Sequence, residues 1–282
     1  MRSVICSILI LTTLLMGTAC CSVESRFLRV PRRSWATPTD VEDVWIEADG
    51  DATMHAWLFK PADATAGEPL PAIAFMHGRS DSMPNYRQIG QSFADATGAA
   101  LFIFEYRGFG KSSDLECISR ATMITDGQAA INTLRARDDI DPSRIAIWGV
   151  SLGAYPATAN FVDDPSIRAL VLWGAPADIK MVIADGHDAL SGFNGLVAKL
   201  AIRQYREPRD EIKDAGDRPV LIVHGEQDTI IKVRNAHALS EAASDADVPV
   251  QVFIDPLSTH SQVSQEAVNE IAAFLHRNLE SK

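Results

Sequence analysis

The stretch IAIWGVSLGAYPATANF, from Ile145 to Phe161, decides the fold that this sequence predicts. It begins as a continuous apolar run, typical of a strand buried on both faces, and continues as a helical pattern rich in small residues. Between the two, Ser151 stands in a tight turn, with Gly149 and Gly153 two residues away on either side. The pattern G-x-S-x-G is weak alone, but between a strand and a helix it is typical of a serine presented for nucleophilic attack. The N-terminus of the helix also favours negative charge that develops beside that serine.

Strand and helix patterns alternate on both sides of this stretch. Continuous apolar runs bounded by glycine predict buried parallel strands, and these runs lie at residues 71–78, 99–108, 144–151, 168–176 and 218–228, with a further strand at 248–256. Helical patterns lie at residues 85–98, 119–137, 151–162, 233–245 and 264–279. Residues 41–61 alternate apolar and polar side chains around a D-G turn, which predicts an antiparallel hairpin. We therefore expect an α/β fold with a mostly parallel, doubly wound sheet and helices on both faces.

One connection in this alternation is longer than a crossover requires. Residues 176–217 are punctuated by glycine and contain helical pieces, where a short helix would suffice. We predict that they form a small helical lid over the carboxyl ends of the strands; an ordinary crossover helix with long loops is the alternative. The domain prediction is one α/β domain at residues 41–282 that carries this lid insertion.

The N-terminal residues differ from the rest of the chain. An arginine near the start, a short apolar run and small residues are typical of a secretory signal peptide cut after Ala19. We therefore predict a signal peptide at residues 1–19, a flexible segment at residues 20–40, and an exported protein. The stretch also resembles a bacterial lipoprotein signal, in which Cys20 carries the lipid, although leucine is usual where Gly17 stands. Plain secretion without a lipid is the alternative.

Charge and cysteine usage bound the partners and cofactors. The 282-residue chain has a formal net charge of −11, which argues against nucleic acid or an anionic membrane surface as a partner. We expect contact with a membrane only through the signal peptide or a lipid on Cys20. Cys117 stands alone outside the N-terminal residues, so no disulfide framework is predicted. No Cys/His spacing typical of a zinc site is present, and we predict neither a metal nor an organic cofactor.

A nucleophilic serine requires a base, and the base requires a carboxylate that orients it. In this topology the chain order is serine, acid, histidine. His260 lies in a loop between the last strand and the final helix, where an imidazole can reach the turn that carries Ser151. Asp228 follows the strand at 218–228 and is the best candidate for the acid, ahead of Glu226 and Asp255. The other histidines that follow the serine are assigned to structural or surface roles; they are His224, His237 and His276.

The negative oxygen of a tetrahedral intermediate requires backbone N–H donors. One should come from Leu152, the residue after the nucleophile, and the other from the loop after the strand at 71–78, where Arg79 is the candidate. His77 precedes Gly78 in that loop, and we expect it to brace the loop rather than to transfer protons.

Five motifs occur in an order that is typical of one superfamily: HGRSDS, EYRGFGKSS, GVSLG, HGEQD and STH. From Val41 to Leu279 the chain resembles the α/β-hydrolases. YRGFGKSS together with a small lid resembles the serine aminopeptidase-like or monoacylglycerol-lipase-like group. The sequence departs from the pattern at Glu105, where aspartate is more usual, and we expect that change to affect strand packing, not chemistry. The resemblance implies hydrolysis of an acyl compound, but the fold hosts many reactions.

The predicted function is a serine hydrolase that cleaves a carboxylic ester of a small molecule through an acyl-enzyme. A thioesterase and a peptidase that releases N-terminal residues are alternatives within enzymes, and a non-catalytic binding protein is the alternative outside them. A peptidase of that kind needs a carboxylate to hold the substrate's ammonium group, and its candidates are Asp178, Asp185 and Asp188. Apolar residues of the insertion either form an acyl pocket or pack the insertion onto the sheet; they are Met181, Val182, Ile183, Phe193, Leu196, Val197 and Leu200.

Overall fold

The computed structural model describes residues 41–79, 82–185 and 206–280, the side chain of Gln88 excepted, and six positions before them: Ser25, Leu28, Arg29, Trp35, Ala36 and Pro38. The predicted signal peptide, Cys20 and residues 186–205 of the insertion lie outside the described residues.

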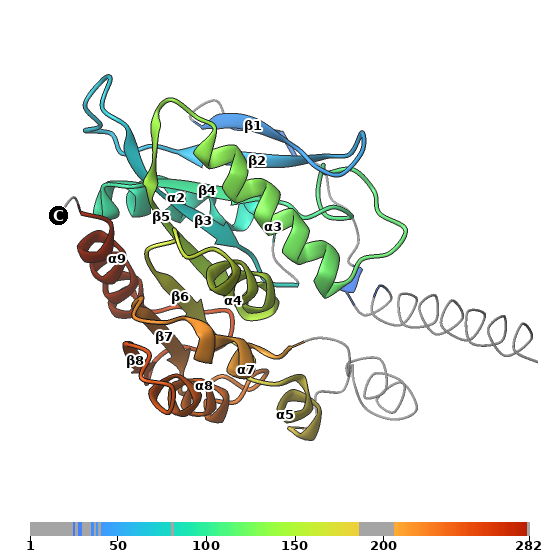
Figure 1. Ribbon diagram of the computed structural model, residues 1–282, viewed down its shortest axis with the longest axis vertical. Helices are drawn as coiled ribbons and strands as arrows, with labels where there is room; N and C mark the ends of the chain where they lie inside the picture. The colour runs from blue at the N-terminus through green and yellow to red at the C-terminus, as the bar shows by residue number, and fades with distance from the viewer. Residues whose placement is uncertain are drawn as a thin grey trace, which may run out of the picture.

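The described residues form an eight-stranded sheet in the order β1-β2-β4-β3-β5-β6-β7-β8 (Figure 1). The strands are β1 (Glu42–Glu47), β2 (Thr53–Phe59), β3 (Leu70–Met76), β4 (Ala100–Phe104), β5 (Ile140–Val150), β6 (Leu170–Trp173), β7 (Val220–Gly225) and β8 (Val250–Asp255). β1 and β2 form the predicted antiparallel hairpin, and β2 also runs antiparallel to β4. All other neighbouring strands are parallel, so the carboxyl ends of β3 to β8 lie at one edge of the sheet.

The helices alternate with the strands as the sequence predicts. They are α2 (Met83–Thr97), α3 (Arg120–Arg135), the 3₁₀ turn η1 (Ser151–Gly153), α4 (Ala154–Asp163), α5 (Ile179–Ala184), α7 (Pro208–Glu211), the 3₁₀ turn η4 (Ile212–Asp214), α8 (Arg234–Ser244) and α9 (Gln265–Leu279). The prediction of a mostly parallel, doubly wound α/β fold is confirmed.

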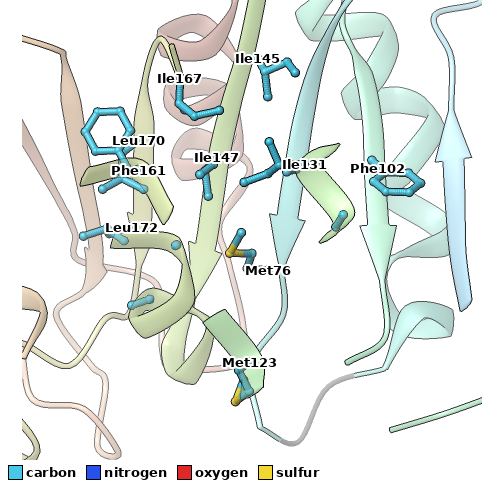
Figure 2. Packing of buried hydrophobic residues seen from close by; sticks show 14 of the residues in the cluster. Met76, Phe102, Met123, Ile131, Ile145, Ile147, Phe161, Ile167, Leu170 and Leu172 are labelled. Atoms are coloured by element: carbon cyan, nitrogen blue, oxygen red, sulfur yellow. The ribbon is translucent and has the colours of Figure 1, made fainter. Parts of the chain in front are cut away.

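Both faces of the sheet are covered, because alternate residues of the central strands point to opposite sides. On one face, Ala74 and Met76 of β3 belong to a core with residues of α3, α4 and α8, and Figure 2 shows part of this packing around Met76, Ile131 and Phe161. On the other face, Phe75 belongs to a core with residues of α2 and α9. The strands are therefore apolar throughout, which is why they appear in the sequence as continuous apolar runs.

The two ends of the insertion between β6 and β7 are fastened to each other. The backbone N–H of Arg209 donates to the carbonyl oxygen of Ala177 over 3.1 Å, and the Arg209 guanidinium lies 2.9 Å from the carboxylate of Asp178. The carboxylate of Glu207 accepts from the backbone N–H of Ile179 at the start of α5. These contacts fix where the insertion leaves and rejoins the sheet, while the domain division and the lid itself stay predictions.

The described positions near the N-terminus lie against the loop after β4. Leu28 is buried in the core that includes α3, and the Arg29 guanidinium lies 3.2 Å from the carboxylate of Asp114.

Cys117 is disulfide-bonded, so the prediction that this cysteine stands alone is wrong. Sequence reasoning missed the bond because the other three cysteines are crowded at positions 6, 20 and 21, far from Cys117 in the chain. Within the part of the chain that the structure describes, no helix is long and apolar enough to cross a membrane.

Candidate active site

The turn after β5 holds Ser151 in a strained backbone conformation. Its φ angle is +52°, in the left-handed region that residues other than glycine seldom occupy. A Cβ atom on Gly153 would lie 2.0 Å from the carbonyl oxygen of Met76, and one on Gly149 would lie 2.5 Å from the Cβ of Ala157. Both glycines of the motif are therefore required by close approach of neighbouring atoms, and the chain there folds so tightly that the serine stands at the crest of the turn.

The structure brings together the three residues that the sequence singles out. The hydroxyl of Ser151 lies 2.9 Å from Nε2 of His260, and Nδ1 of the same ring lies 2.7 Å from a carboxylate oxygen of Asp228. An ionised carboxylate only accepts hydrogen bonds, so Nδ1 carries the proton and Nε2 of a neutral ring accepts from the serine. The residues come from the loops after β5, β7 and β8, which end at the same edge of the sheet (Figure 1). Such a chain can move a proton from the serine to the imidazole as the serine attacks.

Asp228 is held in one orientation by its own loop. The residue is 3% exposed, and its Oδ1 accepts from the backbone N–H groups of Ile230 and Ile231, each over 2.8 Å, while Oδ2 faces His260 at 2.7 Å and Nε2 of His224 at 3.5 Å. His224 also holds this loop, because its Nε2 donates to the carbonyl oxygen of Ile231 over 2.7 Å. Burial lowers the pKa of His224, so its ring is neutral at pH 7 and acts as a structural donor. The structural role predicted for His224 agrees with this geometry.

The loop that carries His260 is held by Asp255, which from the sequence alone is only a candidate for the acid. Its carboxylate accepts from the hydroxyl of Ser258 and from the backbone N–H of Leu257. Burial acts to raise the pKa of Asp255, but these hydrogen bonds outweigh it and hold the pKa below its ordinary value. The carbonyl oxygen of Ser258 in turn accepts from the backbone N–H of Gln227, so the loops of the acid and the base touch each other. The sequence signal for this support is only that an aspartate ends the last strand.

The predicted oxyanion donors lie in segments that touch the serine turn. The N–H of Leu152 belongs to the first helical turn after β5, where N–H groups have no partner within the helix. Arg79 follows the end of β3, and the carbonyl oxygens of Met76 and His77 both pack against Gly153. The backbone before Arg79 is thus in contact with the turn that carries Ser151. The assignment of the two N–H groups stays a prediction.

The described part of the insertion packs onto the body of the protein. Val182 is buried against Ile231 with Ile183 beside it, and Met181 packs against the core under α3 and α4. This favours the packing role for those three residues; the other apolar residues proposed for a pocket lie outside the described residues: Phe193, Leu196, Val197 and Leu200.

The carboxylates considered for an ammonium site have other partners. Asp178 caps α5 through the N–H of Lys180 and pairs with Arg209, and Asp185 pairs with Arg234 over 2.7 Å. Asp188 lies outside the described residues.

Among the residues that the structure describes, no group of three or more His, Cys, Asp or Glu side chains is placed to hold a metal ion.

The arrangement of strands, helices and loop ends defines an α/β-hydrolase. Residues 67–208 match the family described as serine aminopeptidase, S33, and the chain belongs to that family. A curated relative is the protein YfhR of Escherichia coli O157:H7, which is 26% identical over 252 residues, or 85% of this chain and 83% of the relative.

Two solved structures show the fold. The esterase Pf2001 of Pyrococcus furiosus superposes with a TM-score of 0.70 at 19% identity, over 89% of this chain and 100% of that chain. A puromycin-hydrolyzing peptidase of Mycobacterium tuberculosis superposes with a TM-score of 0.68 at 18% identity, over 87% of this chain and 41% of that chain. The same fold therefore carries ester and peptide chemistry, and the chain is a hydrolase of this family.

Proposed function

We propose that the protein is a serine hydrolase that cleaves a carboxylic ester through an acyl-enzyme, with Ser151, His260 and Asp228 as its catalytic triad. The observation that carries the proposal is the unbroken chain of short contacts from the Ser151 hydroxyl to His260 and on to Asp228, over 2.9 and 2.7 Å. The strained φ of Ser151 supports it, because such strain is concentrated at active sites.

The reaction has two halves. Ser151 Oγ attacks the ester carbonyl as its proton passes to Nε2 of His260, and the carbonyl oxygen becomes an oxyanion that accepts from the N–H groups of Leu152 and Arg79. The C–O bond to the alcohol then breaks, and His260 returns the proton to the leaving oxygen. Water repeats the attack on the acyl-enzyme with the same histidine as base, which frees the carboxylic acid and restores the serine. Asp228 keeps the imidazole in the tautomer that this sequence of proton transfers requires.

A peptidase is the second candidate, favoured by the family description and by the peptidase among the solved structures of the same fold. Release of N-terminal residues requires a carboxylate that is available to the substrate's ammonium group. Asp178 and Asp185 are each paired with an arginine, and this favours the ester over the amine-bearing peptide. A thioester differs from an ester only in its leaving group, and its hydrolysis would use the same residues.

The test is labelling by a fluorophosphonate probe, followed by turnover of p-nitrophenyl esters of increasing chain length, of aminoacyl p-nitroanilides and of an acyl thioester. We expect labelling and ester turnover in the wild type and neither in Ser151→Ala, while Ser92→Ala, which changes an exposed serine, behaves as wild type. Turnover of the anilides without the esters would establish the peptidase, and turnover of the thioester alone would establish the thioesterase. Unchanged turnover in Ser151→Ala would refute the triad.

We also propose that the protein is exported, on the character of residues 1–19. Mass spectrometry of the mature protein from a bacterial host tests both forms of the proposal. An N-terminus at Cys20 that carries a diacylglyceryl mass means a lipoprotein, and the same N-terminus without that mass means plain secretion. An uncut chain that starts at Met1 would contradict export.

A further inference from the structure

The carboxylate of Glu105 lies between the two ends of the connection from β3 to α2. The residue follows β4 directly and is fully buried. Its Oε1 accepts from the backbone N–H of Met83, the first residue of α2, over 2.8 Å, and its Oε2 lies 3.5 Å from Nε2 of His77 at the start of the connection. Ser82 occupies the N-cap position of α2 without a side-chain capping bond, so the carboxylate of a neighbouring strand serves that helix end instead.

His77 passes this constraint to the backbone. Its ring is buried against Tyr106 and Phe109, and Nδ1 lies 2.8 Å from the carbonyl oxygen of Gly78. A carbonyl oxygen only accepts, so Nδ1 carries a proton, and Nε2 then faces a carboxylate oxygen of Glu105. His77 and Glu105 therefore form a buried pair of polar side chains. The pair thus ties the backbone at Gly78 to the end of β4.

The other side of the same backbone rests on the nucleophile turn. The carbonyl oxygens of Met76 and His77 lie 2.0 and 2.8 Å from where a Cβ of Gly153 would be. Residues 77 and 78 are therefore clamped between Glu105 and the turn that carries Ser151. Arg79, whose N–H is the proposed second oxyanion donor, is the next residue along the chain.

We propose that Glu105 is a positioning residue for catalysis: by holding His77 and the start of α2, it aims the N–H of Arg79 at the oxyanion. This inference rests on the proposed function. It also goes beyond the expectation that Glu105 matters only to strand packing, because the carboxylate contacts Met83 and His77, at the two ends of the connection from β3 to α2. The glutamate suits the task because its side chain is one methylene longer than that of aspartate.

Three variants of Glu105 separate positioning from packing. Glu105→Met keeps the size of the side chain and removes both polar contacts, whereas Glu105→Gln can still accept from Met83 and can donate to Nε2 of His77. Glu105→Asp keeps the charge and loses the reach. Ser112→Ala is the control for disturbance of the strand end, because the Ser112 hydroxyl donates to the backbone oxygen of Glu105 over 2.6 Å and accepts from the backbone N–H of His55 over 3.0 Å, and the variant keeps the Glu105 side chain.

The measurement is steady-state hydrolysis of a p-nitrophenyl ester, with kcat expressed per active site titrated by fluorophosphonate so that unfolded protein does not count. We expect kcat to fall about 100-fold in Glu105→Met, the effect of misplacing a donor by about an ångström, with KM within about threefold of wild type. Inhibition by a boronic acid, which forms a tetrahedral adduct on the serine, should weaken by the same factor as kcat. Glu105→Gln should stay within about threefold of wild type, and Glu105→Asp should lie between the two.

The outcomes that overturn the inference are distinct from those that overturn the proposed function. Wild-type kcat in Glu105→Met, or equal losses in Glu105→Met and Ser112→Ala, would refute a positioning role while the triad stands. If Glu105→Met does not fold, wild-type kcat and boronate affinity in Glu105→Asp would refute it. A wild type without Ser151-dependent turnover would refute both.

Discussion

The turn that carries Ser151 and the loops that carry Asp228 and His260 are held by different forces. At the turn, backbone and small side chains meet so closely that positions 149 and 153 have no room for a Cβ. In the loops, geometry depends on hydrogen bonds that carboxylates accept: Asp228 accepts from N–H groups of its own loop, and Asp255 accepts from the loop that carries His260. The serine is placed by steric exclusion, and its two partners are placed by polar contacts.

This difference predicts different kinds of failure. A side chain added at the turn would overlap neighbouring atoms, so the substitution should lower the free energy of unfolding. A carboxylate altered in a loop leaves the packing intact but frees or reorients a side chain, so the cost appears in the reaction rate or in the dependence of stability on pH. Substitutions that keep size and change one property can separate the two.

The largest effect is expected for Asp228→Asn. The amide can still accept from the N–H groups of Ile230 and Ile231, so the loop should keep its shape, but the ring of His260 loses the acceptor that fixes its tautomer. We expect kcat for a p-nitrophenyl ester to fall about 10⁴-fold at an unchanged melting temperature. Asp138→Asn, which changes an exposed aspartate, is the control. A loss smaller than tenfold would mean that another carboxylate orients the histidine.

The next effect tests steric placement at the turn. Gly153 has an ordinary φ of −62°, so Gly153→Ala adds only the clash with the backbone of Met76 and His77, whereas Gly50 has a φ of +68° and no atom within 4 Å of an added Cβ. We expect urea unfolding to show a loss of about 3 kcal/mol or more for Gly153→Ala and of about 1 kcal/mol for Gly50→Ala. If the two variants lose the same free energy, the turn relaxes to accept a side chain, and steric exclusion does not place the serine.

The same difference explains what the sequence could predict. Steric exclusion at the turn requires a local sequence pattern, two glycines around Ser151, and the buried strands require continuous apolar runs. The fold and the position of Ser151 could therefore be predicted from the sequence. Asp228 and His260 could be chosen only by their order and by their places after strands. Contacts that join residues far apart in the chain leave no local pattern. Glu207, for example, accepts from Arg120 and Tyr155, and nothing in the residues around it marks those partners.

A third prediction concerns the support of the His260 loop. The pKa of Asp255 is lowered in the folded protein, so its contribution to stability is present above the ordinary value of 3.8 and is lost as the pH falls through the folded-state pKa. We expect Asp255→Asn to destabilise the protein by about 2 kcal/mol at pH 7 and by less at pH 3, measured by urea unfolding. Ser258→Ala removes one of the same hydrogen bonds without removing the charge. A destabilisation by Asp255→Asn that is equal at both pH values would mean that the loop depends on shape and not on the ionised carboxylate.

The smallest effect is expected at Glu211, a carboxylate at the end of the insertion whose ionisation should act in the opposite direction. Burial raises the pKa of Glu211 from 4.5 to about 7, with Asp163 and Glu207 adding to the shift and Arg206 opposing it. Because the folded-state pKa lies above the unfolded value, stability is greatest at low pH and declines as the pH rises from about 4.5 to about 7. Glu211→Gln should therefore raise the free energy of unfolding at pH 8 by about 1 kcal/mol, well below what the full shift corresponds to, because the side chain is partly exposed to solvent.

At pH 4.5 the two proteins should unfold at nearly the same urea concentration, and Glu241→Gln, which changes an exposed glutamate of α8, should show no such dependence on pH. A stabilisation that is equal at both pH values would locate the effect in the amide's own contacts and not in the charge. The opposite pH dependence of Asp255→Asn and Glu211→Gln would show that hydrogen bonding, not the carboxylate itself, decides whether a charge supports a loop. Asp255 has backbone N–H and hydroxyl donors around it, whereas at Glu211 the negative charges of Asp163 and Glu207 raise the pKa in addition to burial.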